Sequence, residues 1–159
     1  MKQGFFAIVT LLLAACASGP HFPVNDVNTE LRPAGASQAS VVGQRVLWSG
    51  MIIANHAQQD HTQLEVLAYP FDFQQKPDTD ARTQGRFLAN HKGLLDPAEY
   101  APGRLITLKG RIAGSLEGKI EEMAYTYPLV EVSDIYLWPQ EEPLPRDPQL
   151  HFGIGVIFH

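Results

Sequence analysis

The sequence has 159 residues and a single cysteine, Cys16. With one thiol no intrachain disulfide can form, so the domain has to fold without that cross-link. The apolar stretch of residues 4–15 is shorter than the roughly 20 residues that a membrane-spanning helix needs. This stretch is therefore not predicted to be a permanent transmembrane anchor.

Basic residues and catalytic motifs are also scarce. Twelve Lys and Arg face 17 Asp and Glu, for a formal net charge of −5, and no basic patch with interleaved aromatics is present, which argues against nucleic acid as a partner. The sequence has no G-x-S-x-G elbow, phosphate loop or dinucleotide fingerprint. His56 and His61, with Asp60 between them, lie in a polar turn without further ligands at a recognisable spacing. We predict no catalytic residue, no metal and no cofactor, and a protein that is not an enzyme.

The surroundings of Cys16 carry the clearest signal. Lys2, the apolar run and the small residues that follow have the three-part pattern of a secretory signal peptide. Residues 13–16 (LAAC) match the lipobox of bacterial lipoproteins, in which the thiol takes a diacylglyceryl group before cleavage frees the amine. Two or more acyl chains anchor a protein stably without crossing the bilayer. We predict a signal peptide over residues 1–15 and lipid attachment at Cys16; the alternative is an ordinary signal peptide cut near Ala15.

The remainder divides into three parts. Residues 16–40, rich in Ser, Pro, Gly and Ala, are predicted to be the lipidated Cys and a flexible tether. Residues 41–138 are predicted to be the folded domain. Residues 139–159 are predicted to be a Pro-rich exit loop followed by a segment in which Gly alternates with large apolar residues.

Alternating apolar residues and 12 prolines with 13 glycines predict short strands joined by turns. A helical turn is expected at 94–100, with Asp96 as N-cap and Pro97 in the first helical position. Gly50 suggests a bulge or bend in the first strand, and Gly118 suggests a hairpin turn. The five predicted strands span residues 41–55, 62–71, 85–90, 104–114 and 127–138. This order predicts an all-β fold, a small OB-like five-stranded Greek-key barrel with one helical turn between strands 3 and 4; an open meander or a sandwich is the alternative.

Two arginines are the candidates for ligand binding. Arg86 and Arg104 each begin a strand directly after a glycine, which predicts that both lie at one end of the barrel beside Tyr100. In that place we interpret them first as rim arginines that bond nearby carboxylates or carbonyls. The functional alternative is a groove for an anionic ligand, formed with Tyr100.

An ordered set of short motifs resembles the Slp (starvation-inducible) family of outer-membrane lipoproteins of Gram-negative bacteria. Met123 and Ala124 depart from the family pattern, which has a more polar, glycine-containing segment before Tyr125. The resemblance implies an envelope lipoprotein linked to starvation, stationary phase or stress, and it supplies no catalytic residue. In chain order the motifs are residues 48–50 (WSG) with Ile52, 62–66 (TQLEV), 69–72 (YPFD), 85–87 (GRF), 95–97 (LDP) with Tyr100, 103–104 (GR), Thr107, Gly110, 127–128 (YP) and Trp138.

The predicted function is that of a non-catalytic outer-membrane lipoprotein acting in envelope structure or binding. An enzyme acting on an envelope polymer and a small-ligand-binding barrel are the alternatives. Ala17 and Ser18 stand where an Asp would retain a lipoprotein at the inner membrane, so we expect the sorting machinery to deliver it to the outer membrane with its barrel in the periplasm. The predicted partners are the membrane, through the lipid, the sorting machinery and an envelope protein.

Overall fold

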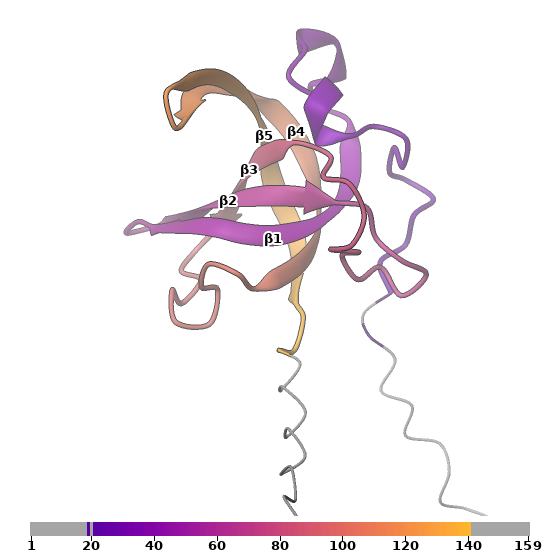
Figure 1. Ribbon diagram of the computed structural model, residues 1–159. Helices are drawn as coiled ribbons and strands as arrows, with labels where there is room; N and C mark the ends of the chain where they lie inside the picture. Colours follow the sequence, from indigo (N-terminus) through magenta and orange to yellow (C-terminus); the bar gives the residue numbers. More distant parts are fainter. Residues whose placement is uncertain (1–18, 20, 141–159) are drawn as a thin grey trace, which may run out of the picture.

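The computed structural model describes residue 19 and residues 21–140, which form five strands (Figure 1). Their inward sides are set by alternation of side chains, most clearly in the second strand, where Thr62, Leu64, Val66 and Ala68 are all buried. The strands are β1 (Arg45–Ala57), β2 (His61–Tyr69), β3 (Arg86–Lys92), β4 (Leu105–Ile120) and β5 (Met123–Leu137).

The strands close into a barrel in the order β1-β2-β3-β5-β4. Neighbouring strands are antiparallel except for β3 and β5, which run parallel and pair from Leu88–Leu129 to Asn90–Glu131. A five-stranded Greek-key barrel of this kind is the OB architecture. The predicted all-β, OB-like fold is therefore confirmed.

The barrel interior is filled by apolar side chains from all five strands. Trp48 and Phe87 pack edge to face with ring centroids 5.0 Å apart, a geometry that aromatic pairs prefer. Both residues are buried. The other fully buried large side chains include Val46, Ile52, Leu64, Val66, Ile106, Leu108, Ile112 and Val130.

The hairpin between β4 and β5 differs from the prediction. Gly118 is not in the turn; it pairs with Tyr125 inside the ladder, and the chain reverses at Glu121 and Glu122. A Cβ on Gly118 would lie 3.0 Å from the Tyr127 ring, so the glycine makes room for that ring. The arm is therefore longer than predicted and extends past the barrel (Figure 1).

Gly50 has a related role in β1. The predicted irregularity in this strand exists, but the register shifts between Ile52 and Ala54 rather than at the glycine. At Gly50 the neighbouring strand comes so close that a Cβ would lie 2.3 Å from the carbonyl oxygen of Leu67. The glycine is required there by close strand approach.

Regular helix is almost absent from the described residues. The predicted turn after β3 is a single hydrogen-bonded turn, in which the Tyr100 amide donates to the Asp96 carbonyl over 2.8 Å. The Asp96 carboxylate accepts from the Ala98 amide, as expected of a capping residue. Two short 3-10 turns, η1 (Pro33–Gly35) and η2 (Ala39–Val41), precede β1 and were not predicted.

Residues 21–40, predicted to belong to a flexible tether, lie against the barrel instead. The indole N–H of Trp48 donates to the Leu31 carbonyl over 2.8 Å, and the Ala34 amide donates to the Gln84 carbonyl over 2.9 Å. Ala36 is buried in the core cluster. This segment belongs to the folded domain, because it covers one end of the core and satisfies a buried indole. The predicted signal peptide, Cys16 and residues 141–159 lie outside the described residues.

Candidate functional site

Arg86, the first residue of β3, is held in a polar cluster on the outer face of the sheet. Its guanidinium donates to the Glu65 carboxylate over 2.8 Å, with side chains only 27% and 18% exposed. The Tyr127 hydroxyl donates to the same carboxylate over 3.2 Å, and the Arg86 amide donates to the Tyr125 hydroxyl over 2.9 Å. Arg86 is thus paired and helps to hold the β4–β5 arm against β2 and β3.

The electrostatics of this cluster follow from its partial burial. The hydrogen bond to Glu65 raises the pKa of Arg86, so its charge is retained. Burial, reinforced by the Glu65 carboxylate, raises the pKa of Tyr127 above its usual value. The neutral Tyr127 phenol and the Arg86–Glu65 ion pair bond one another, so each group of the cluster already has a partner.

Tyr100 and Arg104 lie in another part of the barrel, in the loop between β3 and β4. Arg104 donates to the Glu99 carbonyl over 2.8 Å and to the Trp138 carbonyl over 3.1 Å. Burial raises the pKa of Tyr100. Its backbone carbonyl accepts from the side-chain amide of Asn55 over 3.2 Å. Arg104 therefore ties the end of β5 to this loop.

Arg86 and Arg104 have different hydrogen-bond partners in the structure. Arg86 pairs with Leu67 on β2, and Leu105, next to Arg104, pairs with Met51 on β1. In the closed order β1-β2-β3-β5-β4, β5 lies between β3 and β4 on one side, and β1 and β2 lie between them on the other. Both arginines bond carboxylate or carbonyl groups nearby, as the interpretation as rim arginines predicts. The groove that joins them with Tyr100 stays a prediction.

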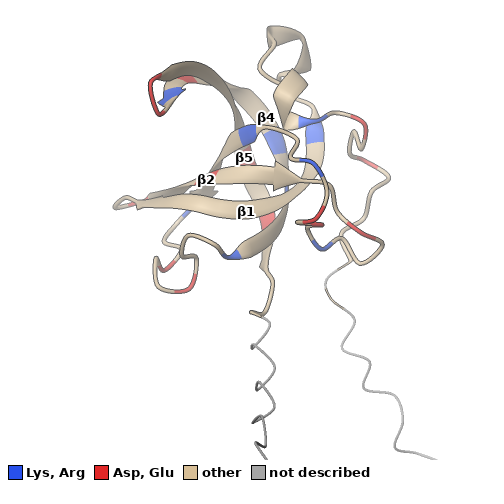
Figure 2. Cartoon of the chain, viewed as in Figure 1, with Lys and Arg blue, Asp and Glu red and all other residues tan. Residues whose placement is uncertain are grey.

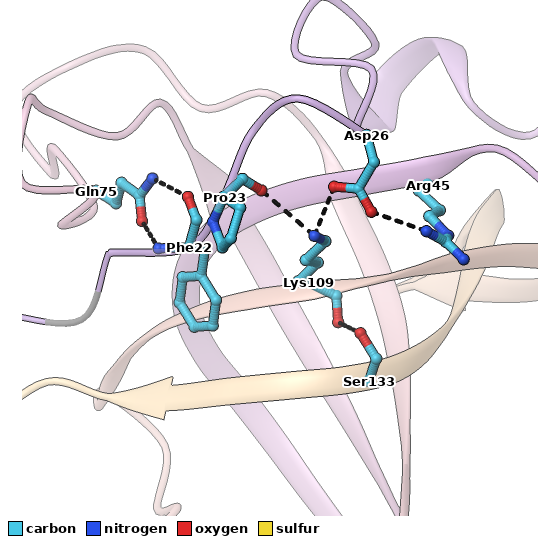
Figure 3. A network of polar contacts seen from close by, with 7 residues as sticks. All are labelled: Phe22, Pro23, Asp26, Arg45, Gln75, Lys109 and Ser133. Atoms are coloured by element: carbon cyan, nitrogen blue, oxygen red, sulfur yellow. Dashed lines mark hydrogen bonds and ion pairs between the residues drawn. The ribbon is translucent and has the colours of Figure 1, made fainter.

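A clamp of polar contacts, which the sequence did not predict, fixes the N-terminal segment (Figure 3). The side chain of Gln75 exchanges two hydrogen bonds with the backbone of Phe22, at 2.8 and 2.9 Å. Asp26 accepts from Lys109 over 2.6 Å and from Arg45 over 2.8 Å. These hydrogen bonds lower the pKa of Asp26. No local signal marked these partners, because each joins residues far apart in the chain.

The clamp continues into the barrel. Gln75 is almost fully buried, and its backbone carbonyl accepts a hydrogen bond from the Thr107 hydroxyl. The Trp138 indole N–H donates to the same hydroxyl over 2.9 Å. Gly19 lies against Trp138, since a Cβ added to it would stand 2.9 Å from the ring. The start of the described chain is therefore held at the end of the barrel where β5 finishes.

The remaining observations concern metal binding and membrane-spanning helices. The described residues hold no group of three or more His, Cys, Asp or Glu side chains arranged to bind a metal ion. His61 contacts Asp60 over 2.8 Å through a ring nitrogen. Among residue 19 and residues 21–140, no helix is long and apolar enough to cross a membrane.

Comparison with solved structures gives weak matches. The mitochondrial single-stranded DNA binding protein Rim1 of S. cerevisiae is 14% identical, with a TM-score of 0.40 over 63% of this chain and 99% of that one. A small single-stranded DNA-binding protein from Streptomyces coelicolor is 10% identical, with a TM-score of 0.38 over 60% of this chain and 94% of that one. These TM-scores are too low to carry an argument about this protein.

Comparison with protein families and curated proteins is informative. The Outer membrane protein Slp of Escherichia coli is 30% identical over 99% of this chain and 86% of its own length. The Uncharacterized lipoprotein YeaY of Escherichia coli is 32% identical over 72% of this chain, and the match spans 61% of the length of YeaY. The model of the Outer membrane lipoprotein Slp family matches residues 13–155. The chain therefore belongs to the Slp family and is an outer-membrane lipoprotein.

Proposed function

We propose that this protein is anchored through acyl chains on Cys16 and that its barrel acts without catalysis in envelope structure or binding. The observation that carries the proposal is the LAAC motif at residues 13–16, directly behind an apolar run and inside the region that matches the family. The folded domain begins only a few residues later, at the clamp around Phe22. A lipid on Cys16 thus holds a barrel close to the membrane surface.

The polar groups of the barrel support a non-catalytic role. The Arg86–Glu65–Tyr127 cluster is internally paired, and Arg104 bonds backbone carbonyls. An enzyme needs an acid, base or nucleophile that faces a substrate. In the described part of the chain, the pairing of these groups favours a structural role over catalysis.

The charge distribution supports a partner other than nucleic acid. Figure 2 shows Lys and Arg interspersed with Asp and Glu along strands and loops. The formal net charge of the chain is −5, and binding to a phosphate backbone depends on clustered cations. We propose that the barrel, exposed to the periplasm, meets an envelope protein, and that it serves the starvation or stress physiology implied by the family resemblance.

The lipid is tested with Cys16→Ser in the full chain. This change should abolish labelling by radioactive palmitate and leave the precursor uncleaved, because acylation precedes cleavage at a lipobox. Ser18→Ala is the matched control, since it alters a neighbouring residue outside the LAAC motif, and it should be labelled and cleaved normally. A Cys16→Ser protein that is still cut to mature size contradicts the proposal.

The route to the outer membrane is tested by changing the residues after the cysteine. Ala17 and Ser18 are small and uncharged, so nothing there resembles the Asp that retains lipoproteins at the inner membrane. In sucrose-gradient fractionation, the double variant Ala17→Asp, Ser18→Asp should move from the outer-membrane to the inner-membrane fraction. A double variant that stays with the outer membrane contradicts this sorting rule for the protein.

A further inference from the structure

The proposed lipid and the barrel are joined by a very short piece of chain. Only two residues separate Cys16 from Gly19, and Gly19 lies against Trp138 at the barrel end. At about 3.5 Å per residue, the three steps from Cys16 to Gly19 span at most about 10 Å. If Cys16 is acylated, as proposed above, Gly19 and this end of the barrel stay within about 10 Å of the acylated cysteine, close to the bilayer surface.

The loop that follows β2 lies at the same end. Gln75 of this loop holds the backbone of Phe22, and Figure 3 shows the two residues side by side. In Figure 1 the loop lies near the point where the N-terminal trace turns grey. The last described residues of the chain, Pro139 and Gln140, line one hollow together with residues 76–80 of this loop. The loop therefore lies at the end of the barrel that the lipid holds near the membrane.

This loop presents a bare aromatic ring. Phe73 is 90% exposed, more than any other large apolar side chain of the described residues. Its backbone is nevertheless held firmly, because the Asp72 carboxylate accepts from the amides of Gln74 and Lys76 at 2.8 and 2.9 Å. The Gln75 amide donates to the Asp72 carbonyl over 3.0 Å. A rigid loop that holds a phenyl ring in water is costly unless the ring has an apolar environment to enter.

We propose that Phe73 inserts into the bilayer that carries the protein's own acyl chains, as a second membrane contact that fixes the orientation of the barrel. Aromatic side chains suit the boundary between headgroups and acyl chains. The three acids of this loop, Asp72, Asp78 and Asp80, outnumber its two bases, Lys76 and Arg82, so the loop offers no net positive charge for strongly anionic lipids and the surface it meets is one of zwitterionic lipids. The β4–β5 hairpin then points away from the membrane.

The proposal is tested on the full lipoprotein, purified from membranes and reconstituted in vesicles of phosphatidylcholine and phosphatidylethanolamine. Phe73→Cys and Met123→Cys variants are labelled with the environment-sensitive dye NBD through the new thiol. Met123 is the matched control, because it is also apolar and 75% exposed but lies in the β4–β5 hairpin. Quenching by lipids that carry a nitroxide in the upper acyl chain then reports contact with the bilayer.

We expect NBD at position 73 to be blue-shifted and quenched several-fold more strongly than NBD at position 123. Equal quenching at the two positions, or stronger quenching at 123, overturns the proposal and leaves the lipid itself untouched. The protein without a new cysteine tests the lipidation of Cys16 separately from the membrane contact of Phe73. A Cys16 sulfur that is bound in a thioether has no thiol to react with the dye. Labelling of that protein by the dye overturns the lipidation at Cys16 and, with it, the short connection on which the Phe73 contact rests.

Discussion

Replacement of Gly50 by Ala tests the closeness of β1 and β2. The added Cβ would lie 2.3 Å from the Leu67 carbonyl oxygen and 2.7 Å from Cγ1 of Val66, both far inside normal contact. The carbonyl is part of the β2 backbone, so relief requires the two strands to move apart. Overpacking of this kind costs typically 1–3 kcal/mol, and a backbone obstacle places Gly50→Ala at the upper end, about 3 kcal/mol. The smaller entropy of the unfolded Ala chain returns about 0.4–1 kcal/mol, for a net loss of about 2–3 kcal/mol.

The loss is measured by urea unfolding of a chain that begins at Gly19, followed through the fluorescence of Trp48 and Trp138. The midpoint should fall without a change in slope, and the melting temperature should drop by about 10 °C for a domain of this size. Gly35→Ala is the matched control, because a Cβ there meets no heavy atom within 4 Å. It should stay within about 0.5 kcal/mol of the parent. If Gly50→Ala is as stable as Gly35→Ala, the close strand approach is wrong.

Three further predictions address the turn, the clamp and the buried tyrosine. Asp96→Ala should lower the unfolding free energy by about 1 kcal/mol through loss of its bond to a backbone amide, and an unchanged urea midpoint would count against the cap. Lys109 and Arg45 lower the pKa of Asp26 below its usual 3.8, so the clamp should be intact above pH 3.8 and should weaken as pH falls through the lowered pKa. Asp26→Asn should open residues 21–30 to limited proteolysis already at pH 7. Equal cleavage of variant and parent would refute this. The pKa of Tyr127 lies above 10.0, so the stability linked to its neutral phenol should persist below pH 10 and disappear as pH rises through the raised value. In an ultraviolet titration Glu65→Gln should bring the ionisation of this tyrosine to lower pH, and an unchanged curve would show that the carboxylate does not contribute.

The strands were predictable because their signal is local. In β2, predicted at 62–71 and observed at His61–Tyr69, every second side chain is buried, and all of these except Thr62 are apolar. Such alternation records which side of a strand faces the core, and it survives in the sequence wherever one side is buried. The same local character made Asp96 recognisable as a cap, because its acceptor and the amide it serves are two residues apart.

The lengths and ends of the elements were less predictable. Glycine is common in turns, yet Gly118 lies inside the β4–β5 ladder, where the Tyr127 ring packs over it. Residues 21–40 have the composition of a linker, yet they cover the barrel end and accept the hydrogen bond of Trp48. In both places a contact across the fold outweighed a weak local preference, which composition alone does not record.

The sequence by itself determined that the chain has no intrachain disulfide and forms short strands in an OB-like order, and it predicts the lipobox at Cys16, since each of these depends on residue identity or on neighbours along the chain. Tertiary structure alone decided the partners of the polar groups. Arg86 and Arg104 look alike in sequence, each following a glycine at the start of a strand, but barrel closure gives one to Glu65 and the other to the Trp138 carbonyl. Which side chains meet across a barrel depends on strand register and order, which many distant contacts set together.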